Sequence, residues 1–311
     1  VMCVEELSKV CGTTGVIVSA HTSLCCDPIL TYGTEEQKQK YLRPLIDGSE
    51  IGCFALTEPN AGSDAAGCQK QAVKQEDGTY ILNGTSIFTT NSGFADTCIV
   101  FALTDKKLGT KGISAFIVDL HSPGVTVSEN IKRMGIRAAS NCEVSYENVR
   151  VPAANRLGKE GQGFKIAMKA LDGGRIGIAA QAVGLAQGAL NEAMAYVKER
   201  KQFGRPISAF QTTQFKLADM QTKIDAARLL TWRAACVKDA GENYGPAAAM
   251  AKLFASDVAN QVCREAVQLM DGYGYCREYP VERALRDAKI TEIYEGTSEV
   301  QRMVISGNLL K

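Results

Sequence analysis

The sequence predicts an α+β protein in which a compact antiparallel β-region is preceded and followed by helices. Apolar residues recur at helical spacing near the start of the chain and again from about residue 160 onward. Between these regions, short β-branched and aromatic runs alternate with turn residues. We therefore expect an N-terminal helical part over residues 1–50, a middle β-domain over 51–153 and a helical C-terminal domain over 160–311.

The first region is expected to be helical because Leu7 follows Val4, and Leu45 follows Leu42, at helix spacing. The run Thr34-Glu-Glu-Gln37 is a capping-box pattern, which predicts the start of a helix that leads to Pro44. The chain opens inside a helical pattern without a cap or an initiator methionine. We therefore expect a fragment that lacks its natural N-terminus.

The middle region carries several short runs rich in β-branched and aromatic residues, each bounded by Gly, Pro, Asp or Asn. This spacing favours an antiparallel sandwich or a small barrel. The predicted strands are Thr79–Leu82, Thr97–Leu103, Ile113–Val118 and Gly124–Ser128, separated by turns at Asp77–Gly78, Asn83–Gly84 and Ser122–Gly124.

The last region reads as long helices joined by short loops, a pattern typical of an up-and-down bundle. Glycine and proline mark where each helix should stop. The predicted helices run from Phe164 to about Arg200, from Ser208 to about Ala240, from Pro246 to Leu269 before the stop at Asp271–Gly274, and after Thr297.

Composition excludes several classes of function. Thirty-five basic residues against 34 acidic ones give a net charge of +1, so no charge excess favours nucleic acid or an anionic membrane. The longest uncharged run, Ile176–Asn191, is too short and too polar to span a bilayer. Eleven cysteines without a Cys-x-x-Cys pair indicate reduced thiols and a cytoplasmic protein. The two histidines are far apart with no carboxylate or thiol at metal-ligand spacing, so we expect no metal site.

Three segments could bind a ligand, although each also has a structural explanation. Phe54–Asp64 can present backbone N–H groups and hydroxyls, or can be a capped turn. Ile87–Ser92 places an aromatic edge beside hydroxyls, which suits a planar heteroaromatic ring, but ordinary strand ends look similar. Glu199–Pro206 carries cations that favour a helix C-terminus by themselves and could also hold a pyrophosphate.

The fourth segment, Ile290–Gln301, contains a candidate general base. Glu295 follows bulky apolar residues and precedes Gly296, where the backbone can approach a ligand closely. Apolar surroundings raise the pKa of a carboxyl toward neutrality, as a general base requires. The alternative is a helix N-terminus capped by Thr297 or Ser298, with Glu295 placed favourably near the helix dipole. No Gly-x-Gly-x-x-Gly fingerprint supports a Rossmann-type nucleotide site.

Together, in this order, the segments resemble the acyl-CoA dehydrogenase family, in particular its short-chain and bacterial butyryl-CoA members. The resemblance covers essentially the whole chain and implies a truncated N-terminal helical domain, a middle antiparallel β-domain and a C-terminal four-helix bundle. The motifs that carry it are Glu5–Gly12, Leu56–Asp64, Leu171–Gly177, Arg200–Gly204, Gln268–Gly274 and Ile293–Ser298.

The resemblance implies FAD-dependent oxidation of a short-chain acyl-CoA, butyryl-CoA above all, to the trans-2-enoyl-CoA. Glu295 would remove the α-proton while the β-hydrogen leaves as hydride to flavin N5. The backbone N–H of Glu295 and a ribityl hydroxyl would polarise the thioester carbonyl. The implied electron acceptor is an electron-transferring flavoprotein, acting alone or in a bifurcating complex, and the implied assembly is a homotetramer.

Carried over motif by motif, the resemblance also assigns binding roles. The flavin ring side would take Phe54, Leu56, Thr57, Gly62, Phe88, Thr89 and Thr90, with Thr297, Ser298 and Glu299 returning to it. The dinucleotide end of a neighbouring subunit's cofactor would meet Arg200, Gln202, Phe203, Gln211, Gln268, Leu269, Met270, Asp271 and Gly272. The acyl-CoA would meet Ser63, Asp172, Gly173, Gly174, Arg175, Tyr294 and Gly296.

Two residues depart from the family pattern. Asp271 stands where relatives usually have glycine, and its carboxylate could weaken flavin binding or face solvent harmlessly. Thr89 replaces the usual isoleucine. Two other functions remain open, namely a non-catalytic flavin-binding subunit of the same fold and an acyl-CoA oxidase. Glu295 argues against the first, and the chain length argues against the second, because oxidases usually carry an additional C-terminal domain.

Overall fold

The computed structural model describes residues 1–310, which form two compact units. A β unit comprises residues 17–132 and 139–174, and a helical unit comprises residues 1–16, 133–138 and 175 onward. The last passage from one unit to the other lies inside the long helix α6 (Gly163–Glu199). The predicted order of helices, strands and helices is confirmed. The predicted domain boundaries differ from these units and remain a prediction.

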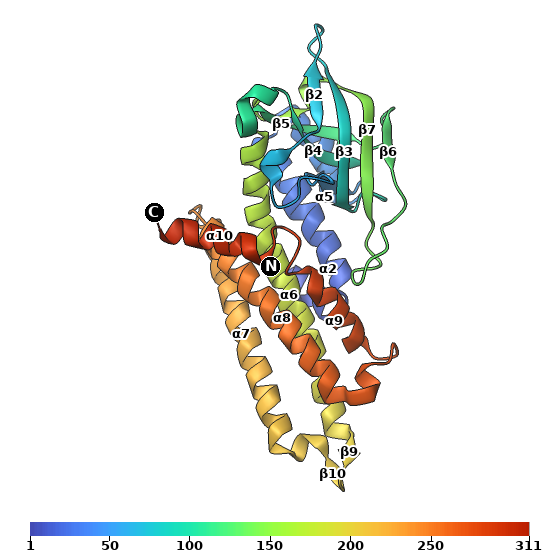
Figure 1. Ribbon diagram of the computed structural model, residues 1–311, viewed down its shortest axis with the longest axis vertical. Coiled ribbons are helices and arrows are strands. Elements are labelled where there is room, and N and C mark those ends of the chain that lie inside the picture. Colours follow the sequence, from blue (N-terminus) through green and yellow to red (C-terminus); the bar gives the residue numbers. More distant parts are fainter. Residues whose placement is uncertain (311) are drawn as a thin grey trace. The chain divides into compact units, whose positions relative to one another are not determined.

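One sheet of eight strands forms the centre of the β unit, in the order β6-β7-β3-β2-β4-β5-β8, with β1 paired to β4 off this path. Most pairs are antiparallel, as predicted, and Figure 1 shows β3 and β7 running side by side. The strands β1 and β2 both pair with β4 in parallel, which the sequence did not indicate. The strands are β1 (Gly52–Ala55), β2 (Gln71–Lys74), β3 (Tyr80–Thr90), β4 (Thr97–Leu103), β5 (Ile113–Asp119), β6 (Val125–Val127), β7 (Asn141–Val151) and β8 (Arg156–Leu157).

Local patterning explains which strands were predicted well. All seven residues of β4 are buried, so its uninterrupted apolar run matches a central strand. The turn predicted at Asn83–Gly84 is wrong, because β3 continues through it to Thr90 with an irregularity in register between Leu82 and Gly84. Gly84 has φ +130°, and a Cβ there would lie 2.8 Å from Cγ of Lys70. The glycine therefore marks a bulge rather than a chain reversal.

Short helices cover part of the sheet within the β unit. The predicted capping box is confirmed, since Thr34 Oγ1 accepts from the Gln37 backbone at 3.2 Å and Gln37 Oε1 accepts from the Thr34 backbone at 3.0 Å. The Gln37 amide also donates to the carbonyls of Ala154 and Arg156, at 2.7 and 2.9 Å. The helical segments are α3 (Asp27–Tyr32), α4 (Glu35–Gln37) and α5 (Arg43–Asp47), with π-helical turns at Ala20–Cys26 and Lys38–Leu42, and 3-10 turns at Ala65–Gly67, Lys106–Gly112 and Ala153–Asn155.

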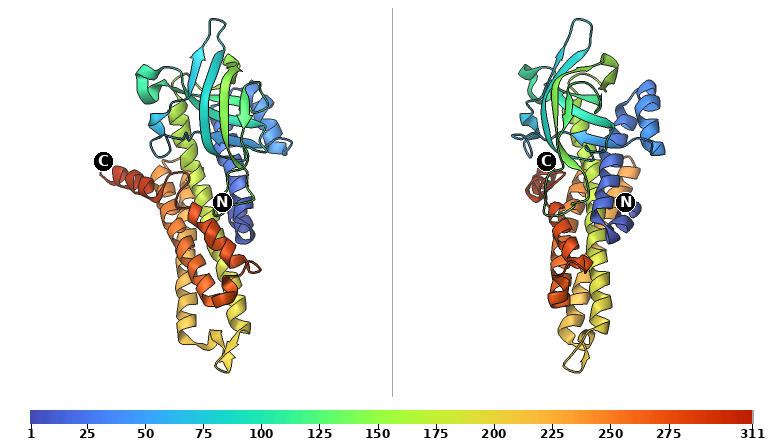
Figure 2. Two further views of the ribbon diagram at one scale, coloured as in Figure 1. Left: turned by 45° about the vertical axis from the view of Figure 1, so that its right-hand side comes forward. Right: turned by 90° about the vertical axis from the view of Figure 1, so that its right-hand side faces the viewer.

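The helical unit is built around α6, α7 and α8, which run alongside one another in Figures 1 and 2. Their core is rich in alanine, which lets the helix axes approach closely. Gly188 of α6 serves the same purpose, because a Cβ there would lie 2.1 Å from the carbonyl oxygen of Lys9. The elements are α1 (Met2–Val10), α2 (Gly12–Ser19), which ends in the β unit, α6, the hairpin β9 (Lys201–Gln202) and β10 (Arg205–Pro206), the 3-10 turn Ile207–Ala209, α7 (Gln211–Asp239), α8 (Gly245–Gly274), α9 (Pro280–Ile290) and α10 (Ser298–Leu309).

The long helices begin and end within a few residues of their predicted limits, but two features differ. The helix α8 continues past Leu269 to Gly274, with non-helical geometry at Asp271, whose φ is 54° and ψ is −137°. The helix α9 was not predicted, although Pro280 occupies one of its first two positions, where proline is favoured.

A short loop, residues 133–138, belongs to the helical unit although strands of the β unit flank it in sequence. The Ile136 backbone N–H donates to the buried carboxylate of Asp287 at 2.6 Å. Arg286 Nη1 donates to the carbonyl of Met134 at 3.0 Å. A Cβ at Gly135 would lie 2.3 Å from the Arg286 carbonyl oxygen, so only glycine fits this close approach. The loop is therefore bound tightly to α9.

Among residues 1–310, no helix is both long and apolar enough to cross a membrane. The same residues contain no group of three or more His, Cys, Asp or Glu side chains that could hold a metal ion. The eleven cysteines are free thiols, and six of them are buried.

Candidate active site

Glu295 lies in the helical unit, in the short connection between α9 and α10. Its backbone has φ +52°, and that of Gly296 has φ +93°. A left-handed backbone is unfavourable for a residue other than glycine, and at Glu295 it costs about 1–3 kcal/mol of conformational energy. Such strain persists where the surroundings hold it in place, and it clusters at functional sites.

The Glu295 carboxyl is withdrawn from water. Part of the residue's surface remains accessible, but its Oε2 atom is shielded from solvent and has no hydrogen-bond partner. Burial raises the pKa of Glu295 from 4.5 to about 8, against the opposing positive charges of Lys252 and then Arg175. A carboxyl with this pKa can take up and release a proton near neutral pH.

Side chains from three helices bind the backbone on either side of this carboxyl. Arg175 Nε, from α6, donates to the carbonyl of Glu295 at 3.3 Å. Gln301 Nε2, from α10, donates to the carbonyls of Glu295 and Gly296 at 3.2 and 2.8 Å. Lys252 Nζ, from α8, donates to the carbonyl of Gly296 at 2.8 Å. We refer to Arg175, Lys252 and Gln301 as the carbonyl clamp.

Gly296 is required at its position for steric reasons as well. A Cβ there would lie 2.7 Å from Gln301 Nε2 and 3.6 Å from Arg175 Nη2. Because the backbone is left-handed and the Gln301 amide fills the space beside it, a side chain here would be strained and would displace Gln301 from the two carbonyls.

The residues flanking Glu295 have structural contacts. The Tyr294 hydroxyl donates to Gln181 Oε1 of α6, and Gln181 donates in turn to the carbonyl of Gly12 at 2.8 Å. Thr297 caps α10, since its Oγ1 accepts from the Val300 backbone at 3.3 Å. The capping interpretation of this segment is therefore confirmed, and it coexists with the unusual position of Glu295. The substrate role of Tyr294 stays a prediction.

In the β unit, the residues predicted to face the flavin ring lie on two adjacent stretches. The Ile87 N–H donates to the Thr57 carbonyl at 2.9 Å, which holds the loop after β1 against the end of β3. Phe88 exposes 58% of its surface and has φ +58°. Asn141 Nδ2 donates to Thr90 Oγ1 at 3.1 Å, so the Thr90 hydroxyl keeps its own proton for another acceptor.

Thr89 differs from its neighbours, because its side chain is buried and its Oγ1 has no hydrogen-bond partner. An apolar side chain would suit this position better. Leu56, Thr57 and Phe54 are half-buried, whereas Gly62 and Ser63 are exposed. Thr89 is the one member of the predicted ring-side group whose side chain is enclosed, so its contribution to a flavin site would come from its backbone.

A buried ion pair supports the loop that carries Thr57. Lys70 Nζ lies 3.2 Å from Glu58 Oε1, and both side chains are almost fully buried. Lys70 also donates to the carbonyl of Leu56 at 3.1 Å, and Glu58 accepts from the backbone N–H groups of Gln69 and Lys70. Despite the burial of its carboxyl, the pKa of Glu58 is lowered by Lys70 and these donors.

The residues predicted for the dinucleotide end of the cofactor form a separate exposed group in the helical unit. Phe203 exposes 92% of its surface, and the Arg200 guanidinium lies 5.6 Å from the ring centre of Tyr273. From Lys252 to Met270 the helix α8 advances 18 residues, or about 27 Å at 1.5 Å per residue. This group therefore lies far from Glu295 along α8. Arg200, Gln202, Gln211, Gln268, Asp271 and Gly272 are exposed and Leu269 is half-buried, but Met270 is buried in the helical core.

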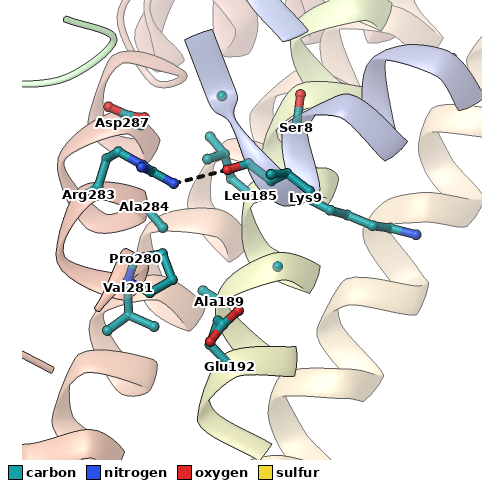
Figure 3. A pocket seen from close by; sticks show the side chains of 13 residues that line it. Ser8, Lys9, Leu185, Ala189, Glu192, Pro280, Val281, Arg283, Ala284 and Asp287 are labelled. Atoms are coloured by element: carbon teal, nitrogen blue, oxygen red, sulfur yellow. Dashed lines mark hydrogen bonds between the residues drawn. The ribbon is translucent and has the colours of Figure 1, made fainter. Parts of the chain in front are cut away.

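Two pockets of about 290 Å³ lie in the helical unit. The first, shown in Figure 3, is lined by α1, α6 and α9, and the Arg283 guanidinium crosses it to reach the Val10 carbonyl at 3.0 Å. It contains none of the predicted site residues. The second is lined by Thr297, Ser298 and Glu299, all predicted cofactor residues, together with charged side chains such as Arg302.

Lys252 and Gln301 were not predicted as site residues. A signal for Lys252 exists in the sequence, because it shares a helix face with Ala248, Ala255 and Ala259, all of which are buried. A lysine on the apolar face of a helix needs a buried partner. Gln301 offers no comparable signal, since its burial depends on how α10 packs.

Chemically, this arrangement provides a desolvated carboxyl of raised pKa on a backbone fixed by three donors.

Models of the N-terminal, middle and C-terminal domains of acyl-CoA dehydrogenase match residues 1–49, 53–149 and 161–310. The short-chain-specific acyl-CoA dehydrogenase of Clostridium acetobutylicum is 58% identical over 311 residues, which cover 100% of this chain and 82% of that protein.

Two solved structures have the same fold along nearly the whole chain. Butyryl-CoA dehydrogenase from Megasphaera elsdenii superposes with a TM-score of 0.98 at 55% identity, over 99% of this chain and 80% of that one. A chain in a structure described as the electron transferring flavoprotein of Acidaminococcus fermentans, from work on flavin-based electron bifurcation, has a TM-score of 0.98 at 56% identity, over 99% and 81%.

Proposed function

The chain belongs to the acyl-CoA dehydrogenase family, and we propose that Glu295 is the base in the FAD-dependent dehydrogenation of a short-chain acyl-CoA. Butyryl-CoA is the proposed substrate, because relatives at 58% and 55% identity are named short-chain-specific acyl-CoA dehydrogenase and butyryl-CoA dehydrogenase. The observation that carries the role of Glu295 is its shielded carboxyl with a pKa of about 8, on a strained backbone held by the carbonyl clamp.

The chemistry assigned to this chain's residues follows from those properties. Glu295 accepts the proton from the carbon next to the thioester carbonyl, and its neutral form is stable in the apolar surroundings. The exclusion of water from Oε2 keeps the base from being hydrated in competition with substrate. FAD, when bound, accepts the hydride from the adjacent carbon. Because the base must be ionised to act, the rate should fall as pH drops below about 8.

The β unit offers features that fit a flavin. Phe88 presents an exposed aromatic ring, and the Thr90 hydroxyl has a proton to donate. Thr57 lies on the neighbouring stretch of chain, fixed by the Ile87 bond and supported by the Glu58–Lys70 pair. These residues would hold the ring and orient it through hydrogen bonds and ring contacts.

The exposed group at Arg200 supports a homo-oligomer. Its distance of about 27 Å from the Glu295 end of α8 is too large for both ends of α8 to serve one compact site easily. We propose that the dinucleotide end of a neighbouring subunit's cofactor in a tetramer is held by Arg200, Gln202, Phe203, Gln211 and Gln268–Gly272. An electron-transferring flavoprotein is the electron acceptor in this proposal, and the free thiols support a cytoplasmic location.

The proposal is tested by anaerobic reduction of the purified, flavin-loaded protein. Addition of butyryl-CoA should bleach the flavin absorbance, and Glu295→Gln should keep the oxidised spectrum but lose the bleaching. The control is Glu282→Gln, which removes a carboxylate that only binds Arg286 of the same helix, with both contacts at 2.8 Å. The control should bleach like the parent. Normal bleaching of the Glu295→Gln protein would remove Glu295 from the mechanism.

Substrate class is tested in the same assay with butyryl-, octanoyl-, isovaleryl- and glutaryl-CoA. The butyryl thioester should give the largest kcat/KM. A preference for the branched or dicarboxylic thioester would overturn the short-chain assignment while leaving the base unaffected.

A further inference from the structure

Lys252 is a buried cation whose ammonium group binds the backbone next to Glu295. Its side chain has no exposed surface, and its Nζ donates to the Gly296 carbonyl at 2.8 Å. An amine charge in an apolar helix core is costly, so its presence on the alanine-rich face of α8 needs a reason. The carbonyl of Gly296 alone could be satisfied by Gln301, which already donates to it at 2.8 Å.

The first contribution of Lys252 is to geometry. The Glu295 carbonyl lies in the peptide plane that precedes Gly296, and the Gly296 carbonyl lies in the next plane. Donors from α6, α8 and α10 therefore fix two consecutive peptide planes. These two planes flank the Cα of Gly296, so the clamp holds the left-handed φ of Gly296, and it anchors the carbonyl end of Glu295, from whose Cα the carboxylate side chain leaves.

The second contribution is to charge. Burial lowers the pKa of Lys252 to about 8, while the negative charges of Glu295, Glu292 and Glu299 oppose the lowering. Lys252 is in turn the first positive charge that opposes the burial of the Glu295 carboxyl. The charged or titratable groups that act on this pair are Arg175 from α6, Lys252 from α8, Glu292, Tyr294 and Glu295 from the connection before α10, and Glu299 from α10.

We propose that Lys252 is a positioning residue for the dehydrogenation: it fixes the Gly296 carbonyl and supplies the positive charge that favours the ionised form of Glu295. This inference rests on the proposed function of Glu295. Without the cation, the carboxyl would face burial with only Arg175 opposing it. A nearby opposite charge lowers the pKa of a carboxyl by about 1 to 3.

Two variants separate charge from geometry. Lys252→Gln keeps a donor for the Gly296 carbonyl but removes the charge, and Lys252→Met removes both. The rate of flavin reduction by butyryl-CoA is measured against pH in the flavin-loaded protein. Both variants should move the acid limb upward by about one pH unit or more, which is a tenfold or greater loss of rate at a pH below both midpoints. Lys252→Met should also lose at least about tenfold on the alkaline plateau, where Lys252→Gln retains most of the rate.

Two controls identify effects that arise merely from a disturbed structure. Gln301→Met removes a neutral donor to the same carbonyls, so it should lower the plateau without moving the midpoint. Lys70→Gln removes another fully buried lysine, which binds Glu58 and Leu56 in the β unit. It should lower stability and leave the midpoint in place. An independent readout is the infrared carboxyl band of Glu295, identified by its loss in Glu295→Gln, whose titration should shift upward in Lys252→Gln.

Each outcome decides a definite point. If Lys252→Gln has the same pH midpoint of flavin reduction as the parent, and its carboxyl band titrates at the same pH, the proposed role of the Lys252 charge is overturned. Equal plateaux for Lys252→Gln and Lys252→Met would overturn the role in fixing the carbonyl. Full activity in Glu295→Gln would instead contradict the proposed function of Glu295. The failure of the Lys252 proposal and the failure of the proposed function are therefore distinguishable.

Discussion

Replacing Glu295 with glutamine should stabilise the protein while it abolishes the reaction. The folded protein holds the carboxyl with a pKa of about 8, against 4.5 in a freely hydrated chain, because burial outweighs the charges of Lys252 and Arg175. A carboxyl of raised pKa binds its proton more tightly in the folded state. Its contribution to the free energy of unfolding is therefore neutral at low pH and becomes increasingly unfavourable as pH rises from 4.5 to about 8. Glutamine has nearly the same shape and no charge to desolvate.

The size of the effect follows from the interval between the two pKa values. A solution at pH 7 is 2.5 pH units above the pKa of 4.5 that the carboxyl has in the unfolded chain, whereas the carboxyl of the folded protein is still mostly protonated at that pH. At about 1.4 kcal/mol for each pH unit, Glu295→Gln should gain about 3 kcal/mol of unfolding free energy. The gain should vanish near pH 4.5 and stop growing above about pH 8.

Urea unfolding of the parent and variant between pH 4.5 and 8.5 measures this difference, at one fixed excess of flavin so that ligand stabilisation is equal. The control is Glu36→Gln, which lies outside the proposed site. Glu36 is exposed and its pKa is lowered, first by a hydrogen bond to its own backbone N–H, so its neutralisation should bring no gain. Unfolding curves of Glu295→Gln that coincide with the parent at every pH would show that the carboxyl is hydrated, and the argument for a raised pKa would fail.

Four further substitutions test the structure. Asp271→Gly should raise the unfolding free energy by about 1 kcal/mol, because φ 54° and ψ −137° suit glycine; the relieved strain of about 1–3 kcal/mol is partly offset by the greater entropy that glycine loses on folding. The reverse change, Gly109→Asp at φ 56° and ψ −130°, should lower the unfolding free energy by a similar amount. An unchanged urea midpoint in either variant would contradict the backbone strain. Lys70→Met should cost about 3–5 kcal/mol by leaving Glu58 buried without its partner, and a loss below 1 kcal/mol would show that water reaches the site. Thr89→Val should gain about 1–2 kcal/mol by removing a shielded hydroxyl that lacks a partner, and a loss of stability would reveal a hydrogen bond to that hydroxyl.

Local sequence patterns predicted the elements whose residues are buried in a pattern that the sequence of the element itself shows. The run Thr97–Leu103 became β4 with the predicted limits, because a central strand is apolar on both faces. The strand β7 was missed although Cys142, Val144 and Tyr146 are buried in alternation with less buried neighbours, a period-two signal that its polar residues obscured. The turn predicted at Asn83–Gly84 was wrong. Asn-Gly is typical of a hairpin turn, but here β3 runs through both residues and stays paired with β7 on either side of them.

The sequence singled out the residue types of the candidate site but not the contacts that support them. Glu295 could be singled out because an acidic residue between apolar residues and glycine is unusual. The clamp on its backbone joins α6, α8 and α10 across 120 residues from Arg175 to Glu295, and no local pattern records such a contact. Tyr294 illustrates the same limit, since its partner Gln181 lies 113 residues earlier in the chain.

The attachment of the 133–138 loop to α9 has a consequence for how a newly made chain matures. Ile136 and its acceptor Asp287 are separated by 151 residues, so the acceptor does not exist while the loop is leaving the ribosome. At the usual pace of synthesis, the delay is on the order of ten seconds or more. During that interval the backbone N–H of Ile136 can bind only water or a chaperone. A nascent chain that is halted before α9 should therefore remain susceptible to proteases at this loop long after its strands have paired.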